Sequence, residues 1–430
     1  MKLKDIGRAL KYRNYRLFFS GQIISLIGTW MQAIALSWLV YRMTNSPLLL
    51  GLVSFSSQIP TLIISPFAGV ISDRVNKHKI IILTQALSMV QALILAALVL
   101  TGNIQIWHIF VLNIFLGIVN GFDIPNRQAF VVEMIENRED LGNAIALNSS
   151  VFNGARLIGP SIAGVLISLL GEGICFLING LSYIAVIAAL FAMRLNPIKK
   201  EVSEKKVMEE LKEGFQYTFN SVPIRSMLLL LALMSLVGMP YTVLMPVFAK
   251  TILGGNAQTL GFLLAAVGVG ALSGAFYLAS RKTVLGLGKF IARGALIFGA
   301  GLIIFSFSRT ISLSIIFLII TGASLMIQMA STNTIIQTIT EDKMRGRVMS
   351  FYTMSFMGLA PFGSLIAGTI ANNIGAPLTL ASGGFFCIVG GLIFLSKLPN
   401  LRRIVRPVYV EKGIIKEIAE GIDKASKSTV

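Results

Sequence analysis

The chain of 430 residues has little charge and almost no cysteine, and both shortages narrow the class to which it belongs. Charged residues make up 13 % of the chain, about half of their share in an ordinary soluble domain. Cys175 and Cys387 both lie inside long apolar runs, where a thiol packs as a small apolar side chain. A protein stapled by disulfides is therefore excluded, and so is an ordinary soluble domain.

The sequence also lacks the motifs of ATP-driven and metal-dependent proteins. No G-x-x-x-x-G-K-[ST] pattern occurs, because Gly288 and Lys289 are followed by Phe290. The two histidines, His78 and His108, have no partner at metal-ligand spacing. We therefore expect no enzyme, no cofactor and no metal site.

Long apolar runs dominate what remains. Hydrophobic residues make up 55 % of the chain, and the mean hydropathy is +0.78. A helix needs about 20 apolar residues to cross a bilayer, and runs of this length are too long for barrel strands. The sequence therefore predicts an all-α polytopic membrane protein with twelve spans: 17–41, 47–72, 80–101, 105–133, 144–170, 174–194, 226–250, 258–280, 289–308, 311–335, 347–371 and 376–396.

The net charge of +18 is distributed by topology rather than gathered on one surface. Basic residues crowd the start of the chain and every second connection, whereas the other connections hold only Arg42, Lys250 and Arg309. This positive-inside bias predicts that both termini lie in the cytoplasm, as in a prokaryotic cell membrane, and that the first span is retained. A nucleic-acid partner would need a single basic surface, so we expect none.

Glycines reveal an internal repeat. A triplet with five-residue spacing occurs in spans five and eleven, and glycines in spans one and two recur in spans seven and eight. Such a repeat predicts two parallel six-helix halves: 1–194 and 226–396, joined by a linker at 195–225 that includes an amphipathic helix, with a tail at 397–430. We expect close helix packing or a role in rocking at Gly154, Gly159, Pro160, Gly164, Gly358, Gly363 and Gly368.

Five local patterns carry a family resemblance over nearly the whole chain. They are Gly28–Gln32, Gly69–Lys79, Asp123–Phe130, Arg156–Pro160 and Arg345–Ser350. In this order the patterns resemble the drug and siderophore exporters of the major facilitator superfamily, the branch that contains enterobactin and macrolide exporters. The resemblance implies a transporter that exports a small molecule, with protons as the coupling ion.

The resemblance also implies a cytoplasmic gate. Asp73 would face the N-terminus of span eleven, and Arg74 and Lys77 would bridge to acids at the end of span four. Such a latch would hold the outward-facing state. A plainer alternative is that these residues only fix orientation and cap a helix. The predicted gate residues are Gly69, Asp73, Arg74, Lys77, Glu133, Arg345 and Arg347.

Charges inside the spans are few, and such charges are costly enough to be functional candidates. Asp123 and Arg127 share one face of span four, and Arg156 in span five lies within reach of them. An acid that exchanges an arginine for a proton would couple transport to the proton gradient. The alternative is a static salt bridge, and Asn113 stands where the wider family often has another arginine.

A substrate cavity is expected near the midplane between the halves. By family analogy, spans one, four, seven and ten line it. The second half has no acid inside its spans, which favours an amphipathic or neutral substrate over a multiply charged cation. Each polar candidate could instead make an interhelical hydrogen bond. The candidates are Trp30, Gln32, Gln58, Asn113, Asn120, Tyr241, Gln328 and Asn333.

The sequence thus predicts a proton-coupled secondary transporter that exports a small amphipathic compound by alternating access. We expect it to act as a monomer in the lipid bilayer. A lysophospholipid flippase or facilitator without proton coupling is the first alternative. A non-transporting sensor on the same fold is the second.

Overall fold

A computed structural model describes residues 7–72, 75–194, 207–281 and 283–415. In these ranges twelve helices are long and apolar enough to cross a membrane, which confirms the predicted number and order of spans. No strand occurs in the part of the chain that is described. Twelve crossings return the chain to the side on which it began. We call this side the termini end and the opposite side the far end.

The N-terminal half consists of six spanning helices and two short 3₁₀ turns at the termini end. Both turns flank membrane spans: η1 (Arg8–Lys11) precedes the first, and η2 (Arg138–Asp140) precedes the fifth. The spans are α2 (Arg13–Thr44), α3 (Pro47–Ser72), α4 (Lys77–Leu100), α5 (Ile106–Glu133), α6 (Leu141–Leu170) and α7 (Glu172–Phe191).

The C-terminal half has less regular helices. The seventh span comprises α9 (Val222–Leu233), a π-helical turn η3 (Met234–Gly238), α10 (Tyr241–Val247) and a second π turn η4 (Phe248–Ile252). The eleventh is likewise broken into α14 (Arg345–Thr353), the π turn η5 (Met354–Gly358) and α15 (Ala360–Ile374). The regular spans are α11 (Ala257–Ala279), α12 (Leu287–Phe307), α13 (Ile311–Ile339) and α16 (Ala376–Glu411).

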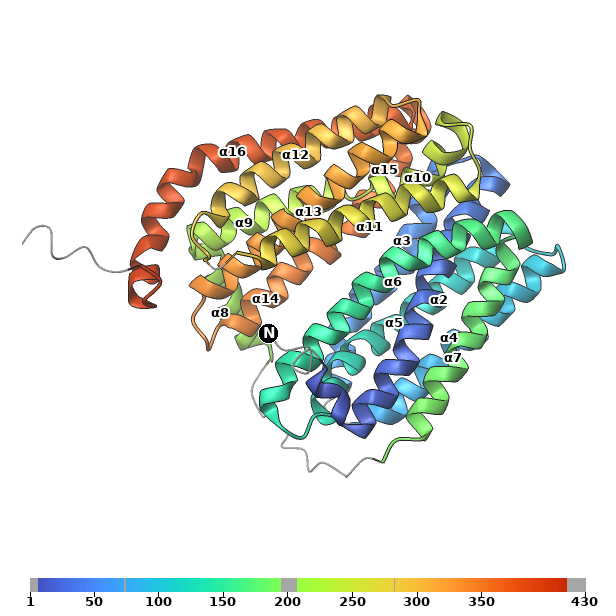
Figure 1. Ribbon diagram of the computed structural model, residues 1–430, viewed down its shortest axis with the longest axis horizontal. Coiled ribbons are helices and arrows are strands. Elements are labelled where there is room, and N and C mark those ends of the chain that lie inside the picture. The colour runs from blue at the N-terminus through green and yellow to red at the C-terminus, as the bar shows by residue number, and fades with distance from the viewer. Residues whose placement is uncertain (1–6, 73–74, 195–206, 282, 416–430) are drawn as a thin grey trace, which may run out of the picture.

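Two features of this half concern the predicted linker and tail. The amphipathic helix expected in the linker is α8 (Val207–Asn220), and its Phe215 and Phe219 pack against Phe351 of α14. The predicted tail begins inside α16, because this helix continues from 396 to Glu411 and extends past the bundle (Figure 1).

The two halves meet along two helix pairs, α6 with α11 and α3 with α15. Glycines lie at both contacts. A Cβ placed on Gly51 would lie 2.5 Å from the carbonyl oxygen of Ser364 and 3.1 Å from the Cα of Gly368. A Cβ on Gly164 would lie 3.1 Å from the Cα of Gly261. The glycines that revealed the repeat therefore pair across the two halves, Gly51 with Gly368 and Gly164 with Gly261.

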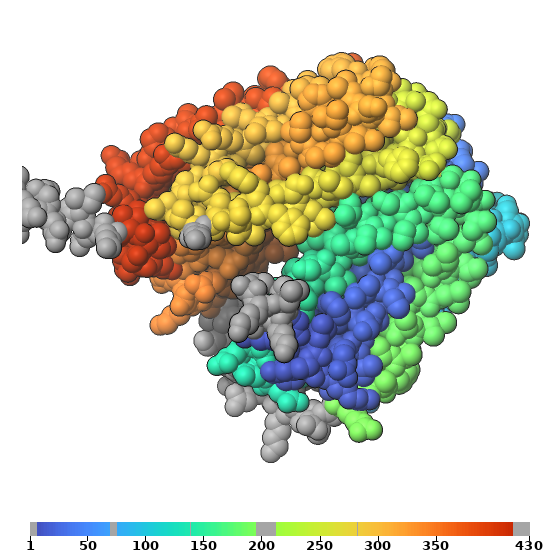
Figure 2. Space-filling view, viewed as in Figure 1, coloured from blue at the N-terminus to red at the C-terminus, as the bar shows by residue number. Residues whose placement is uncertain are grey.

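The halves are joined most closely at the far end. Among the described residues, two hydrogen bonds cross between them, and both lie there. The hydroxyls of Tyr41 and Thr251 are 2.6 Å apart, and Lys250 Nζ donates to Asn45 Oδ1 at 2.8 Å. Nearer the termini end, a Cβ on Gly154 of α6 would meet no atom within 4 Å. Figure 2 shows the surfaces of α6 and α11 meeting over the right of the view and parting toward the left.

The start of the chain is bound to the connection between α5 and α6. Lys11 Nζ lies 2.7 Å from Asp140 Oδ2, and the Tyr12 hydroxyl donates to the same oxygen at 2.8 Å. The Ala9 amide donates to Asn143 Oδ1 at 2.9 Å. The ammonium and hydroxyl groups hold the pKa of Asp140 below its ordinary value, and Asp140 in turn raises the pKa of Lys11.

Alanine at Gly51 should weaken the contact between the halves. The new methyl would lie against the backbone of α15, which has to shift, and overpacking of this kind costs about 1–3 kcal/mol. Spin labels at Glu136 and Lys343, on exposed connections of the two halves, would report a broader distance distribution. Gly154→Ala is the matched control, because its methyl enters open space. Equal distributions in both variants would contradict a role for the glycine contact.

Asp140→Asn should lower thermal stability in a pH-dependent manner. Because its pKa is lowered, Asp140 stabilises the fold above the ordinary carboxyl value of 3.8 and loses this effect as the pH falls through the lowered pKa. Lys11, whose pKa is raised, stabilises the fold fully below 10.5 and loses the effect as the pH rises further. Melting temperatures of the two proteins should differ from pH 5 to 9 and converge in acid. A constant difference down to pH 3 would count against this ion pair.

Candidate functional site

A buried ion pair lies in the N-terminal half. Asp123 and Arg127 are one helical turn apart on α5, and Asp123 Oδ2 is 3.3 Å from Arg127 Nε. The Asp123 side chain is 5 % exposed and the Arg127 side chain 26 %. Of the two pairings that the sequence allowed, the structure thus has Asp123 with Arg127, and Arg156 lies elsewhere.

Neighbouring helices satisfy the remaining atoms of this pair. Asp123 Oδ1 accepts hydrogen bonds from the Thr84 hydroxyl at 2.8 Å and the Gln85 amide at 2.9 Å, both on α4. Arg127 Nη1 donates to Gln22 Oε1 on α2 at 3.0 Å. The network therefore joins α2, α4 and α5. Sequence reasoning missed Thr84, Gln85 and Gln22, although polar amides in apolar spans were the available signal.

A second polar layer lies deeper in the same half. Gln32 donates to Gln91 Oε1 at 3.0 Å and accepts from Asn179 Nδ2 at 2.7 Å. Gln32 is 4 % exposed, so it sits among α2, α4 and α7, where it forms the interhelical hydrogen bonds that the plainer reading of the sequence allowed. Asn113 on α5 is also buried, and its Nδ2 has no partner.

The third charge, Arg156, lies beside an aromatic pair formed by Trp30 and Phe152. Its Cζ lies 5.7 Å from the centre of the Trp30 ring, a cation–π distance. Trp30 in turn packs edge-on against Phe152 at 5.6 Å. The Arg156 side chain is half-buried. In the described part of the chain it has no hydrogen bond or ion pair.

Tyr241 of the other half lies near this cluster. It is 1 % exposed, packs against Phe298, and its hydroxyl has no hydrogen-bond partner. The guanidinium of Arg156 is close enough to the phenol to interact with it electrostatically. Trp30, Arg156 and Tyr241 therefore bring α2, α6 and α10 together where the two halves meet.

The remaining cavity candidates are spread over three helices. Gln58 on α3 donates to the Ser54 hydroxyl of its own helix at 2.8 Å, and Asn120 on α5 is half-buried. Gln328 on α13 is fully buried, donates to Thr332 at 3.3 Å, and leaves its Oε1 without a partner.

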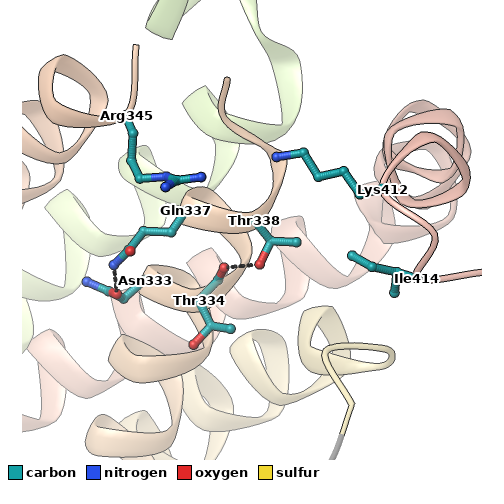
Figure 3. A pocket seen from close by; sticks show the side chains of 7 residues that line it. All are labelled: Asn333, Thr334, Gln337, Thr338, Arg345, Lys412 and Ile414. Atoms are coloured by element: carbon teal, nitrogen blue, oxygen red, sulfur yellow. Dashed lines mark hydrogen bonds between the residues drawn. The ribbon is translucent and has the colours of Figure 1, made fainter. Parts of the chain in front are cut away.

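Asn333 belongs to a pocket at the termini end, between α13, α14 and the end of α16 (Figure 3). The pocket has a volume of about 530 Å³, and Asn333 Oδ1 accepts from Gln337 at 2.6 Å within it. Arg345, predicted as a gate residue, projects into the same pocket and pairs with Asp342. The full lining is Asn333, Thr334, Gln337, Thr338, Arg345, Lys412 and Ile414.

Two other gate candidates, Lys77 and Arg347, each form an ion pair at the termini end. Lys77 Nζ lies 2.6 Å from Glu133 Oε1, within the N-terminal half. Arg347 Nη1 lies 2.5 Å from Glu213 Oε2 and so fastens α8 to α14. Gly69 lies within α3. Two further predicted members of the gate fall outside the described residues, namely Asp73 and Arg74.

The predicted packing glycines have different surroundings. A Cβ on Gly159 would lie 2.6 Å from Trp30 Cβ, and one on Gly363 would enter the backbone of η3 at Leu236. A Cβ on Gly358 would make ordinary van der Waals contacts, 3.5 Å from Leu62 Cδ1 and 3.9 Å from Met354 Cβ. Pro160 lies inside α6. Close helix approach is therefore found at Gly159, Gly164, Gly363 and Gly368, whereas Gly154 borders open space.

Comparisons with known proteins agree with this architecture. The family model of transmembrane secretion effectors matches residues 8–407. A staphyloferrin A transporter of Staphylococcus aureus is 26 % identical, over 90 % of this chain and 97 % of that protein. An enterobactin exporter of Citrobacter koseri is 22 % identical, over 93 % and 95 %. Among solved structures, a bacterial homologue of the human lysosomal transporter Spinster is similar with a TM-score of 0.66 and 15 % identity, over 95 % and 99 % of the two chains.

Removal of Asp123 should destabilise the N-terminal half more than removal of the whole pair. Asp123→Ala leaves the guanidinium of Arg127 without its counter-charge, and the loss of one partner of a buried pair costs about 3 kcal/mol. Adding Arg127→Met should restore much of the stability. Melting curves of the purified single and double variants would measure both effects. A double variant less stable than Asp123→Ala would contradict this account.

Proposed function

The chain belongs to the transmembrane secretion effector family of the major facilitator superfamily, and we propose that it exports a small amphipathic compound by proton-coupled alternating access. The family match and its efflux relatives confirm the resemblance seen in the sequence motifs. Substrate class, proton coupling and direction are parts of the proposal.

The one-sided contact between the halves carries this proposal. The cross-half hydrogen bonds lie at the far end, and the glycine contacts seal α3 against α15 and α6 against α11. Gly154, nearer the termini end, borders open space. A transporter that exposes its central site to one side of the membrane at a time needs a state that is closed at one end and open at the other. The positive-inside bias assigns the open side to the cytoplasm, from which an exporter takes its cargo.

The charged pairs at the termini end support a gate that closes on rocking. In the described state Lys77 pairs with Glu133, and Arg347 pairs with Glu213. We assign the closed gate to these residues together with Gly69, Asp73, Arg74 and Arg345. Their partners would then be exchanged across the halves when the cytoplasmic side shuts.

Asp123 is the proposed proton carrier. In the described state its charge holds Arg127, Thr84 and Gln85. Protonation would remove the negative charge that holds Arg127 in place. The Arg127 side chain could then move away from Gln22, and α2 would be held less firmly to α5. The proton reaches Asp123 past Arg127, which is the more exposed member of the pair.

Internal pH in proteoliposomes tests the coupling. Staphyloferrin A, enterobactin, erythromycin and lysophosphatidylcholine would be added in turn to vesicles holding a pH-sensitive dye. We expect proton movement that depends on one of these compounds, and we expect Asp123→Asn to abolish it. Asp140→Asn is the matched control, since it removes another paired acid of the same half, outside the spans.

The other outcomes separate the alternatives. Substrate movement without proton flux would contradict coupling and would favour a facilitator, with lysophosphatidylcholine as the diagnostic lipid. Proton movement that persists in Asp123→Asn would show that a residue other than Asp123 couples transport to protons. A folded protein that moves none of the compounds would favour a sensor.

A further inference from the structure

Arg156 lies in the middle of a membrane-spanning helix and has no hydrogen bond or ion pair among the described residues. Arg127 pairs with Asp123, and Arg42, nearer the far end, pairs with Glu172. Arg156 lies midway along α6, and its guanidinium carbon is 5.7 Å from the centre of the Trp30 ring. A cation at this depth is retained only where something compensates it.

The position of Arg156 on α6 is equally specific. Toward the far end the helix is sealed against α11, from Gly164 beside Gly261 to Leu157 beside Gly268. Arg156 directly precedes Leu157 in the chain and so lies nearer the termini end, and Gly154, two residues before Arg156, borders open space. Arg156 therefore lies on α6 at the level where the contact with α11 ends.

The surroundings leave its hydrogen-bond donors free. The Arg156 guanidinium lies 5.7 Å from the centre of the Trp30 ring and makes no hydrogen bond to any described residue, so its five N–H donors are available to a ligand. Across the interface the Tyr241 hydroxyl is buried and also lacks a partner. Arg156 and Tyr241 thus each have unsatisfied hydrogen-bonding capacity, in opposite halves, and Trp30 with Phe152 forms an apolar wall beside the guanidinium.

We propose that Arg156 and Tyr241 form a subsite for a carboxylate group of the exported compound. The planar fork of the arginine binds the two carboxylate oxygens, and the tyrosine hydroxyl donates to the same group. Trp30 and Phe152 pack against the apolar part that adjoins it. The inference rests on the proposed export and narrows the substrate class to amphipathic organic anions.

An anionic substrate also explains why the two halves would not close while the site is empty. While the cytoplasmic side is open, water solvates Arg156. Closure of the halves around an empty site would leave the guanidinium unpaired in a dry interior, which is costly. A bound carboxylate supplies the missing charge, so the halves close more readily when the site is loaded.

Matched probes test the subsite. Binding of 1-naphthylacetate, its neutral analogue 1-naphthylacetamide, and 1-naphthyl phosphate would be measured by calorimetry on the full chain in lipid nanodiscs. We expect the wild type to bind the acetate at least about tenfold tighter than the amide, a difference of about 1.4 kcal/mol. Arg156→Gln should abolish this preference and leave the amide affinity within about twofold.

Two variants complete the design. Arg156→Lys keeps the charge without the fork and should retain part of the preference. Arg309→Gln is the control, because this exposed arginine donates, among the described residues, to the carbonyl groups of Ser306 at the end of α12 and of Ser308 just after it. The subsite is contradicted by a wild type that binds acetate and amide equally, or does not bind the acetate. A preference that survives in Arg156→Gln, or tighter binding of the phosphate than of the acetate, contradicts it too.

A ligand-free measurement guards against misfolding. Spin labels at Glu136 and Lys343 should approach each other more often in Arg156→Gln than in the wild type, because no unpaired charge then opposes closure. Unchanged distances contradict the proposed role of the charge.

Transport in proteoliposomes distinguishes failure of the subsite from failure of the export. Equal movement of acetate and amide, insensitive to Arg156, would contradict the carboxylate subsite but leave export standing. Vesicles that move none of these probes, nor the compounds tested above, would contradict both.

Discussion

The contact between the two halves is the constraint on which the rest of this structure depends. In lipid, apolar side chains gain nothing by leaving their surroundings, so helices associate through close packing instead. Gly51 against Gly368 and Gly164 against Gly261 bring backbones together at two symmetric places. Packing of this kind has no strong bonds to break, which suits a joint that must open and close. The few polar cross-links, such as Tyr41 with Thr251, lie at the far end, where they add to the seal.

The two halves share one architecture but not one chemistry. The N-terminal half holds the Asp123–Arg127 pair and the layer around Gln32 inside regular helices. The C-terminal half has no acid in its spans before Glu411, at the end of α16, and carries its irregularities in the backbone, as π turns in the seventh and eleventh spans. Such turns often occur at functional positions. The N-terminal half thus holds its buried polar groups in regular helices, whereas the C-terminal half has two spanning helices interrupted by π turns.

The sequence predicted the spans, their order and the class of protein, because apolar length and charge alternation are local properties of the chain. The i, i+4 spacing likewise predicted that Asp123 could pair with Arg127. The sequence did not disclose Thr84, Gln85 or Gln22, since contacts between spans depend on how each helix is rotated. The continuation of α16 was hidden by its polar composition and two prolines. Equal spacing of the glycines could not show that Gly154 borders open space, because this depends on which state the halves adopt.

If both proposals hold, the number of charges moved in one transport cycle determines how much the membrane potential contributes to export. Export of a monoanion in exchange for one proton carries two charges in the direction that a negative-inside membrane potential favours. Each charge contributes about 2.3 kcal/mol per 100 mV. A neutral substrate exchanged for one proton would receive half of this drive. A single unpaired arginine beside the contact between the two halves would therefore both select an anionic cargo and strengthen the driving force for its export.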